Sequence, residues 1–221
     1  MHGGKKMKIS ILGDSISTFE GYNPEGYAVF YDPSTQARNN LHSASDTWWY
    51  QVIKELNGEL CVNNSYSGSR VSGKAFPSAT SKERLHCLHA SSQPDVLLIY
   101  LGFNDFGYGV KIRNRFKLND PSCFQDAYNI MLKTIKNSYQ ARIVCGTLMR
   151  TRMAGNDYWI FPEYYHGITF EEYNEALRRV ARRNQCDLAD LGNQQYETLD
   201  GTHPTANGHR EIANAGLECF R

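Results

Sequence analysis

A serine near the start of the chain and an aspartate–histidine pair near its end have the residue types of a hydrolytic centre. Ser15 lies in the segment GDSIS (13–17), and Asp200 precedes His203 by three residues in DGTHP (200–204). A carboxylate at this spacing can accept the imidazole Nδ1 proton, so that Nε2 is free to take a proton from serine. Taken singly, the two segments also fit an ordinary turn and a helix cap. Together they indicate a nucleophile with its base.

Two further segments offer hydrogen-bond donors for an oxyanion. Gly68 ends the run NNSYSG (63–68) and can present its backbone N–H at close approach, whereas Asn104 in GFND (102–105) can offer a side-chain amide. Acyl transfer needs such donors, because negative charge develops on the carbonyl oxygen of the substrate. Asp14 and Asp105, which adjoin these residues, are interpreted as structural carboxylates that bond backbone amides.

The elements that must position these residues follow a strand–helix alternation. Five apolar runs have the length of buried strands, at 8–12, 59–63, 95–101, 142–148 and 186–191, and helical patterns lie at 47–56, 82–89, 122–137, 170–184 and 204–219. This order predicts an α/β fold, a three-layer α/β/α sandwich with a five-stranded parallel sheet. The active site of such a sheet lies at the carboxyl ends of its strands. The candidate residues follow those ends, so we expect them to converge.

Three long connections, 18–46, 106–121 and 149–168, are rich in aromatic residues and are expected to form the rim of the site. Their aromatic side chains fit two roles equally well, packing beneath the loops or a surface on which a sugar ring stacks. They are Tyr22, Tyr27, Phe30, Tyr31, Tyr158, Trp159, Phe161, Tyr164 and Tyr165.

Length and charge exclude several classes of partner. The chain has 221 residues and a formal charge of +1, which favours one domain (1–221) acting on a small or neutral molecule rather than on nucleic acid or a membrane. Residues 1–6, before a second methionine, are interpreted as a leader or an alternative start. No apolar stretch has the length of a signal peptide or a membrane span, so we expect a cytoplasmic protein. The oligomeric state stays open.

No metal site is expected, because the chain contains no CxxC pair and His86 and His89 have a spacing that rarely binds metal. Acyl transfer by a serine and its base needs no metal and no organic cofactor, so none is expected. His209 is interpreted as a surface or packing residue. A two-metal phosphoesterase is a less favoured alternative, since it needs more metal ligands than the motifs supply. A non-catalytic carbohydrate-binding module is another, but binding alone would require neither a nucleophile nor a base.

The motifs GDSIS, SYSGS, GFND and DGTHP stand in the order of the four blocks that define the SGNH hydrolase superfamily of GDSL-like lipases and acylhydrolases, and the chain resembles that superfamily from residue 13 to 204. The resemblance implies a flavodoxin-like sandwich. It also implies Ser15, Asp200 and His203 as catalytic triad and an oxyanion hole formed by Ser15, Gly68 and Asn104. The first block departs from GDSL in its fourth residue, which leaves the nucleophile intact.

The resemblance predicts a serine esterase but leaves its substrate open among lipases, lysophospholipases, thioesterases and carbohydrate O-acetyl esterases. The long connections supply tyrosine and tryptophan rather than the Leu/Ile/Val/Met surface that an acyl-chain groove requires. We therefore expect a small O-acyl ester, an acetyl group on a carbohydrate or similar polar alcohol.

Overall fold

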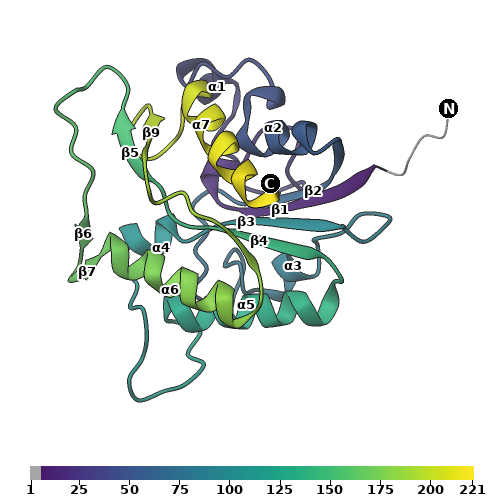
Figure 1. Cartoon of the computed structure of the whole chain (residues 1–221), viewed down its shortest axis with the longest axis vertical. Helices are drawn as coiled ribbons and strands as arrows, with labels where there is room; N and C mark the ends of the chain where they lie inside the picture. The colour runs from purple at the N-terminus through teal and green to yellow at the C-terminus, as the bar shows by residue number, and fades with distance from the viewer. Residues whose placement is uncertain (1–5) are drawn as a thin grey trace.

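Five parallel strands form the central sheet of the computed structural model, which describes residues 6–221 (Figure 1). Across the sheet they are β2 (Gly58–Ser65), β1 (Met7–Gly13), β3 (Val96–Tyr100), β4 (Arg142–Gly146) and β8 (Asp187–Ala189). Each of the five predicted runs overlaps one of these strands, so the predicted parallel sheet is confirmed. The predicted leader, 1–6, lies outside the described residues except for its last position.

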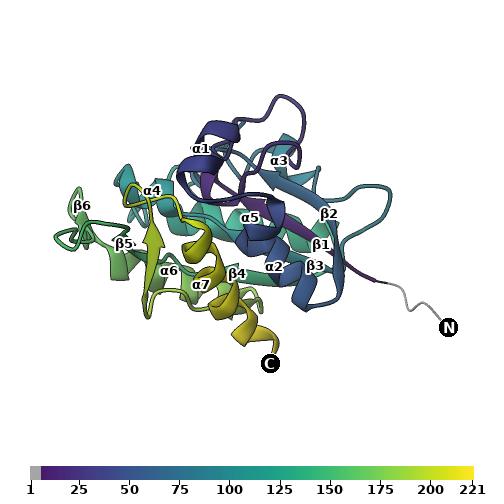
Figure 2. The same cartoon turned by 90° about the horizontal axis from the view of Figure 1, so that it is seen from above.

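Both faces of the sheet are covered by helices. In β3, Leu97 and Ile99 pack into one apolar cluster and Leu98 and Tyr100 into the other, as strand alternation requires. One layer contains α3 (Lys82–Leu85), α5 (Phe124–Ser138) and α6 (Phe170–Arg183), and the other contains α1 (Pro33–Arg38), α2 (Trp48–Glu55) and α7 (Ala206–Leu217). Figure 2 looks onto the layer of α1, α2 and α7. The predicted α/β/α sandwich is therefore correct.

The strand order creates the opening in which the site lies. β1 lies between β2 and β3, so the chain passes from one side of β1 to the other between its second and third strands. At such a reversal, the loops that leave neighbouring strands diverge at their carboxyl ends and leave a crevice. Ser15 follows β1, Gly68 follows β2 and Asn104 follows β3. The fold thus brings three distant segments to one edge.

A second, two-stranded parallel sheet departs from the sequence prediction. It pairs β5 (Arg150–Met153) with β9 (Gln195–Thr198). Both strands are short and polar, but their buried residues Thr151, Tyr196 and Thr198 follow the period of two that a strand requires. Because β9 leads directly into Asp200, this sheet fixes the direction of the histidine-bearing turn.

Several predicted bounds were wrong for reasons that lie in the tertiary structure. The helix expected at 82–89 ends at Leu85, and the last helix begins at Ala206 with Thr205 as its N-cap, so the predicted proline in its first turn lies before the helix. Tyr31 instead bonds the Pro204 carbonyl through its hydroxyl, at 2.8 Å. The long connections also include regular elements, namely α1, β5, β6 (Tyr164–Tyr165) and the start of β7 (Ile168–Thr169), and α4 (Phe103–Gly107) ends within the second connection.

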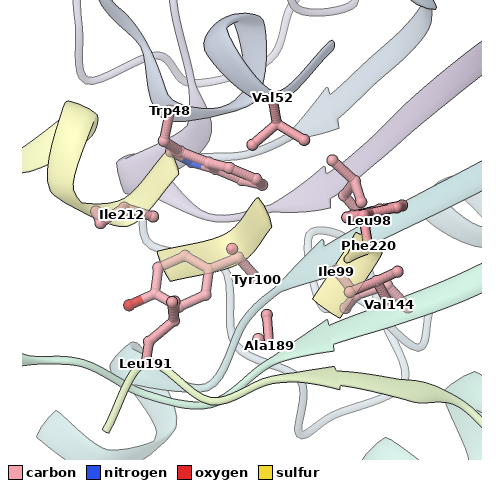
Figure 3. Close-up of a pocket in the computed structure, with 12 residues that line it drawn as sticks. Trp48, Val52, Leu98, Ile99, Tyr100, Val144, Ala189, Leu191, Ile212 and Phe220 are labelled. Carbon is pink, nitrogen blue, oxygen red and sulfur yellow. The ribbon is translucent and has the colours of Figure 1, made fainter. Parts of the chain in front are cut away.

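A small apolar cavity of about 30 Å³ lies in the core between the sheet and the α2/α7 layer (Figure 3). Trp48 from α2 and Tyr100 from β3 line it, with ring centroids 6.1 Å apart. The lining of this cavity is apolar and includes none of the predicted site residues, so it is a packing defect of the core rather than a substrate site. Among the helices of residues 6–221, none combines the length and apolar character needed to span a membrane.

Candidate active site

Ser15 is presented by a tight turn at the end of β1, where it opens the short 3₁₀ helix Ser15–Ser17. The carboxylate of Asp14 caps this turn by accepting a hydrogen bond from the N–H of Ile16 at 3.1 Å. Gly13 is required by close approach, because a Cβ there would lie 2.6 Å from the Cβ of Ser17. The position of Ser15 is therefore fixed by contacts within its own turn, residues 13–17.

His203 connects Ser15 to Asp200 through two hydrogen-bonding contacts. Its Nε2 lies 3.1 Å from the Oγ of Ser15, and its Nδ1 lies 2.8 Å from the Oδ2 of Asp200. The other carboxylate oxygen of Asp200 accepts from the backbone N–H of Thr202 at 3.0 Å and of His203 at 2.8 Å. The structure thus brings together the three residues that the sequence suggested, although Ser15 and His203 are 188 positions apart.

The charge of Asp200 suits its partner. Burial raises the pKa of this carboxyl, but the hydrogen bond and the charge of His203 outweigh that effect and lower the pKa to about 2. Asp200 is therefore ionised at neutral pH and holds the Nδ1 proton of His203. That tautomer leaves Nε2 as an acceptor for the Ser15 hydroxyl proton.

Three other segments hold the histidine in place. The ring of Phe30 stacks on the imidazole of His203, with centroids 3.4 Å apart and planes 8° from parallel. The side-chain amide of Asn39 donates to the backbone carbonyl of His203 at 3.2 Å. The hydroxyl of Thr151 in β5 donates to the backbone carbonyl of Gly201 at 2.8 Å. Phe30 belongs to the aromatic set of the first connection, but its spacing alone gave no sign of this contact.

The predicted oxyanion donors lie in neighbouring loops. Gly68 has a φ of +79°, which favours glycine, and within residues 6–221 neither its N–H nor that of Ser15 has a hydrogen-bond acceptor. The side-chain amide of Asn104 donates to the carbonyl of Ser69 at 3.0 Å and lies 3.4 Å from Oδ2 of Asp14. Asn104 therefore bridges the Ser15 turn and the Gly68 loop, and a substrate oxygen would compete with Ser69 for its proton.

The two buried acidic residues beside the site bond backbone amides, as predicted. Asp105 accepts from the N–H of Val71 at 2.7 Å and of Ser72 at 2.9 Å, which ties the Gly68 loop to the end of β3. Asp14 caps the Ser15 turn. Burial raises the pKa of Asp14 to about 7, and the charge of Asp105 adds to that increase.

Arg84 is a functional neighbour that the sequence reasoning missed. Its side chain is fully buried, and all five of its N–H donors form hydrogen bonds. Nε donates to Oδ1 of Asn64 at 2.6 Å. Nη1 donates to Oγ of Ser69 at 2.8 Å and to the carbonyl of Pro77 at 2.7 Å, and Nη2 donates to the carbonyls of Gly13 and Asn64, both at 2.9 Å. Burial lowers its pKa to about 10, so it stays charged at neutral pH. Arg84 thus joins the end of β1 to the Gly68 loop.

Two surface pockets flank the oxyanion donors. The first, which we call the aromatic pocket, has a volume of about 270 Å³. Its lining includes Asn104, Tyr108, Trp159, Phe161, Tyr165 and Thr202. The second, which we call the basic pocket, has a volume of about 500 Å³. Its lining includes Gly68, Arg70, Gly73, Lys74, Phe76 and Tyr108. Each pocket therefore contains one of the predicted donors, and Tyr108 borders both.

The remaining histidine near the site is a packing residue. His209 is fully buried and its Nδ1 accepts from the N–H of Trp48 at 3.2 Å, which agrees with the packing role and not with a surface one. Burial lowers its pKa to about 3, so it is neutral. In the part of the chain that the structure describes, no group of three or more His, Cys, Asp or Glu side chains is arranged to hold a metal ion.

Comparison with known proteins agrees with the motifs and the fold. Residues 7–156 match the family model described as GDSL-like Lipase/Acylhydrolase. Crystal structures named for GDSL-like lipases from Bacteroides ovatus and Bacteroides uniformis are each 27% identical to the chain, with TM-scores of 0.75 and 0.74. The matches cover 98% of both chains in the first case, and 97% of this chain and 95% of the other in the second.

An acetyl xylan esterase, AlAXEase, shares the fold with 17% identity and a TM-score of 0.61 over 97% of this chain and 100% of its own. No curated protein matches the chain. The family model covers more than half of the sequence, and both Bacteroides structures match it nearly end to end. The chain therefore belongs to the GDSL-like lipase/acylhydrolase family of carboxylic ester hydrolases.

Proposed function

We propose that this protein is a serine esterase that removes a small acyl group, acetyl in particular, from a carbohydrate or similar polar alcohol. The observation that carries the proposal is the contact chain from Ser15 Oγ to His203 Nε2, 3.1 Å, and from His203 Nδ1 to Asp200 Oδ2, 2.8 Å. A hydroxyl, an imidazole and an ionised carboxylate in this order can activate the serine for attack on a carbonyl carbon.

The proposed reaction has two steps. His203 takes the proton of Ser15 as its oxygen attacks the ester carbonyl, and the protonated imidazole then passes that proton to the departing alcohol. The N–H groups of Ser15 and Gly68 and the amide of Asn104 stabilise the oxyanion. Water, deprotonated by His203, then attacks the acyl-enzyme. The bond between the acyl carbon and Ser15 Oγ breaks, the imidazolium returns its proton to that oxygen, and the acid is released. Asp200 stabilises the imidazolium in both steps.

The lining of the aromatic pocket supports a small polar substrate. Its volume of about 270 Å³ lies below the usual range for ligand pockets, roughly 300–1,000 Å³, and no Leu, Ile, Val or Met lines it. Trp159 and Tyr165 place aromatic rings in this lining, which suits a sugar better than a long acyl chain. Two similarly folded proteins are an acetyl xylan esterase and a carbohydrate acetylesterase family member. The fold therefore accommodates such substrates.

The role of Ser15 is tested by substitution and by covalent labelling. Ser15→Ala should remove nearly all hydrolysis of p-nitrophenyl acetate while leaving the unfolding transition unchanged, because the hydroxyl is the attacking atom. Ser91→Ala, an exposed serine outside both pockets, is the control and should retain full activity. A fluorophosphonate should label Ser15 alone. Near wild-type turnover by Ser15→Ala, or labelling of Ser17 or Ser67, would show that the nucleophile is misassigned.

The acyl length is tested by a series of p-nitrophenyl esters from acetate to palmitate. We expect kcat/KM to fall with chain length beyond butyrate, since the aromatic pocket is small and lacks aliphatic side chains. A rise toward octanoate or longer chains would replace the acetyl esterase with a lipase, lysophospholipase or thioesterase of the same family. A preparation that binds acetylated sugars but forms no acyl-enzyme would indicate a carbohydrate-binding protein instead.

A further inference from the structure

The basic pocket has no role in the reaction proposed above, although one of the proposed oxyanion donors lies in its lining. Gly68 lines it, and Tyr108 forms part of both its wall and that of the aromatic pocket, which contains Asn104. Asn104 in turn bonds the carbonyl of Ser69, the residue after Gly68, at 3.0 Å. A substrate whose carbonyl oxygen lies between the donors would therefore have access to both pockets, one on each side.

The loop that forms the basic pocket is held by buried hydrogen bonds. Asp105 accepts from the N–H of Val71 and Ser72, and Arg84 donates to the carbonyl of Pro77 at 2.7 Å. The N–H of Gly73 donates to the carbonyl of Pro121, also at 2.7 Å. These contacts fix the loop from three sides, so the pocket is preformed and a ligand need not order it.

The basic pocket carries two positive charges that form no ion pair with a carboxylate among residues 6–221. Arg70 and Lys74 are both exposed there, no acidic residue lines the pocket, and within residues 6–221 neither cation lies within 4.0 Å of a carboxylate. By contrast, Arg150, Arg152 and Arg178 on other surfaces all pair with glutamates. The guanidinium of Arg70 lies 5.4 Å from the ring centroid of Tyr108, a cation–π contact that leaves its donors available to a ligand.

We propose that the basic pocket binds a carboxylate on the substrate, so that the preferred substrates are acyl esters of acidic sugars. A guanidinium can hold a carboxylate through two parallel hydrogen bonds, and the ammonium group of Lys74 adds a second charge. Phe76, which is 40% exposed, offers a ring face beside these cations, and the volume of about 500 Å³ is sufficient for a sugar unit. This inference rests on the proposed esterase function and narrows its substrate class.

The test compares the release of acetate from an O-acetylated glucuronic acid with its release from the methyl ester of that acid, which lacks the negative charge. For the wild type, we expect kcat/KM to be about tenfold higher for the acid, and the difference to shrink in high salt. In the Arg70→Gln/Lys74→Gln variant the preference should disappear, because acetate release from the acid should fall to the rate seen with the methyl ester. The control, Lys133→Gln/Arg182→Gln, removes the same charge from exposed positions on α5 and α6 and should keep the preference.

A binding measurement separates this inference from the proposed function. Titration calorimetry of Ser15→Ala with the same two compounds should show tighter binding of the acid, and the Arg70→Gln/Lys74→Gln changes should remove the difference. Equal hydrolysis and equal binding of acid and methyl ester would overturn the basic pocket as an anion site and leave the esterase standing. Selective binding of the acid without hydrolysis of either compound by the wild type would support the pocket and refute the esterase.

Discussion

Replacing Arg84 by methionine should destabilise the protein strongly, because this side chain joins the end of β1 to the loop that carries Gly68. Its five hydrogen bonds reach Gly13, Asn64, Ser69 and Pro77. The carbonyls of Gly13 and Pro77 each have a second donor, whereas Asn64 is fully buried and its side-chain oxygen would lose the Arg84 donor. A hydrogen bond to a charged group contributes about 1.5–3 kcal/mol. The summed contribution of the five hydrogen bonds is larger than the net stabilisation from Arg84, because burying the guanidinium itself costs several kcal/mol.

The net loss should be about 3–5 kcal/mol, because the neutral acceptors around the side chain lose a charged donor, and each buried group left unsatisfied costs about 1–3 kcal/mol. For a chain of this size, each kcal/mol lowers Tm by roughly 2–4 °C, so we expect a decrease of roughly 6–20 °C for Arg84→Met. Urea unfolding followed by circular dichroism measures the free energy directly. Lys82→Met on the same helix, where the side chain is exposed, is the matched control and should change stability by less than about 0.5 kcal/mol.

A stability of Arg84→Met within about 1 kcal/mol of the wild type would refute this reasoning, since it would mean that the acceptors find other partners. Arg84→Lys provides a second check. Lysine keeps the charge but has three donors that cannot form the same fork, so its stability should lie between those of the wild type and the methionine variant. Equal stability of the lysine variant and the wild type would assign the effect to charge alone.

Two further predictions concern neighbours of the nucleophile. Asn104→Ala should lower kcat by about 10²–10³ with little change in KM, because an oxyanion donor acts mainly in the transition state, and a change confined to KM would instead make Asn104 a substrate-binding residue. Asp14→Asn should gain stability relative to the wild type as pH rises from about 4 to 7. The carboxyl of Asp14 ionises near pH 3.8 in the unfolded chain but keeps its proton to about pH 7 in the native protein. Ionisation therefore favours unfolding of the wild type across that window, by up to roughly 4 kcal/mol, and the asparagine variant lacks this effect. Urea titrations of both proteins at pH 5 and pH 8 measure this gain, and parallel pH profiles would contradict it.

Much of the fold could be predicted because the information for it is local. The runs of buried Ile, Val and Leu in β1 and β3 are continuous in sequence, and so is the capping box of Thr169 and Glu172 that begins α6. The contact between Asp200 and His203 spans three residues, so spacing alone indicated it. The short strands β5 and β9 could not be predicted in the same way, because their pairing partners are more than 40 positions apart and neither has an apolar run.

The sequence by itself determined which residues are candidates for the chemistry and which elements place them at the carboxyl edge of a parallel sheet. Only the tertiary structure decided how they meet: Ser15 with His203 at 3.1 Å, Phe30 stacked on the imidazole, Asn104 between two loops, and Arg84 buried beneath them. The physical reason is that burial patterns and turns are set by neighbouring residues, whereas these contacts form only when loop closure brings distant segments together. Arginine is usually exposed, so the sequence gives no sign that Arg84 is buried. Its five hydrogen-bond acceptors come from four separate positions in the chain, and only the tertiary structure brings them together.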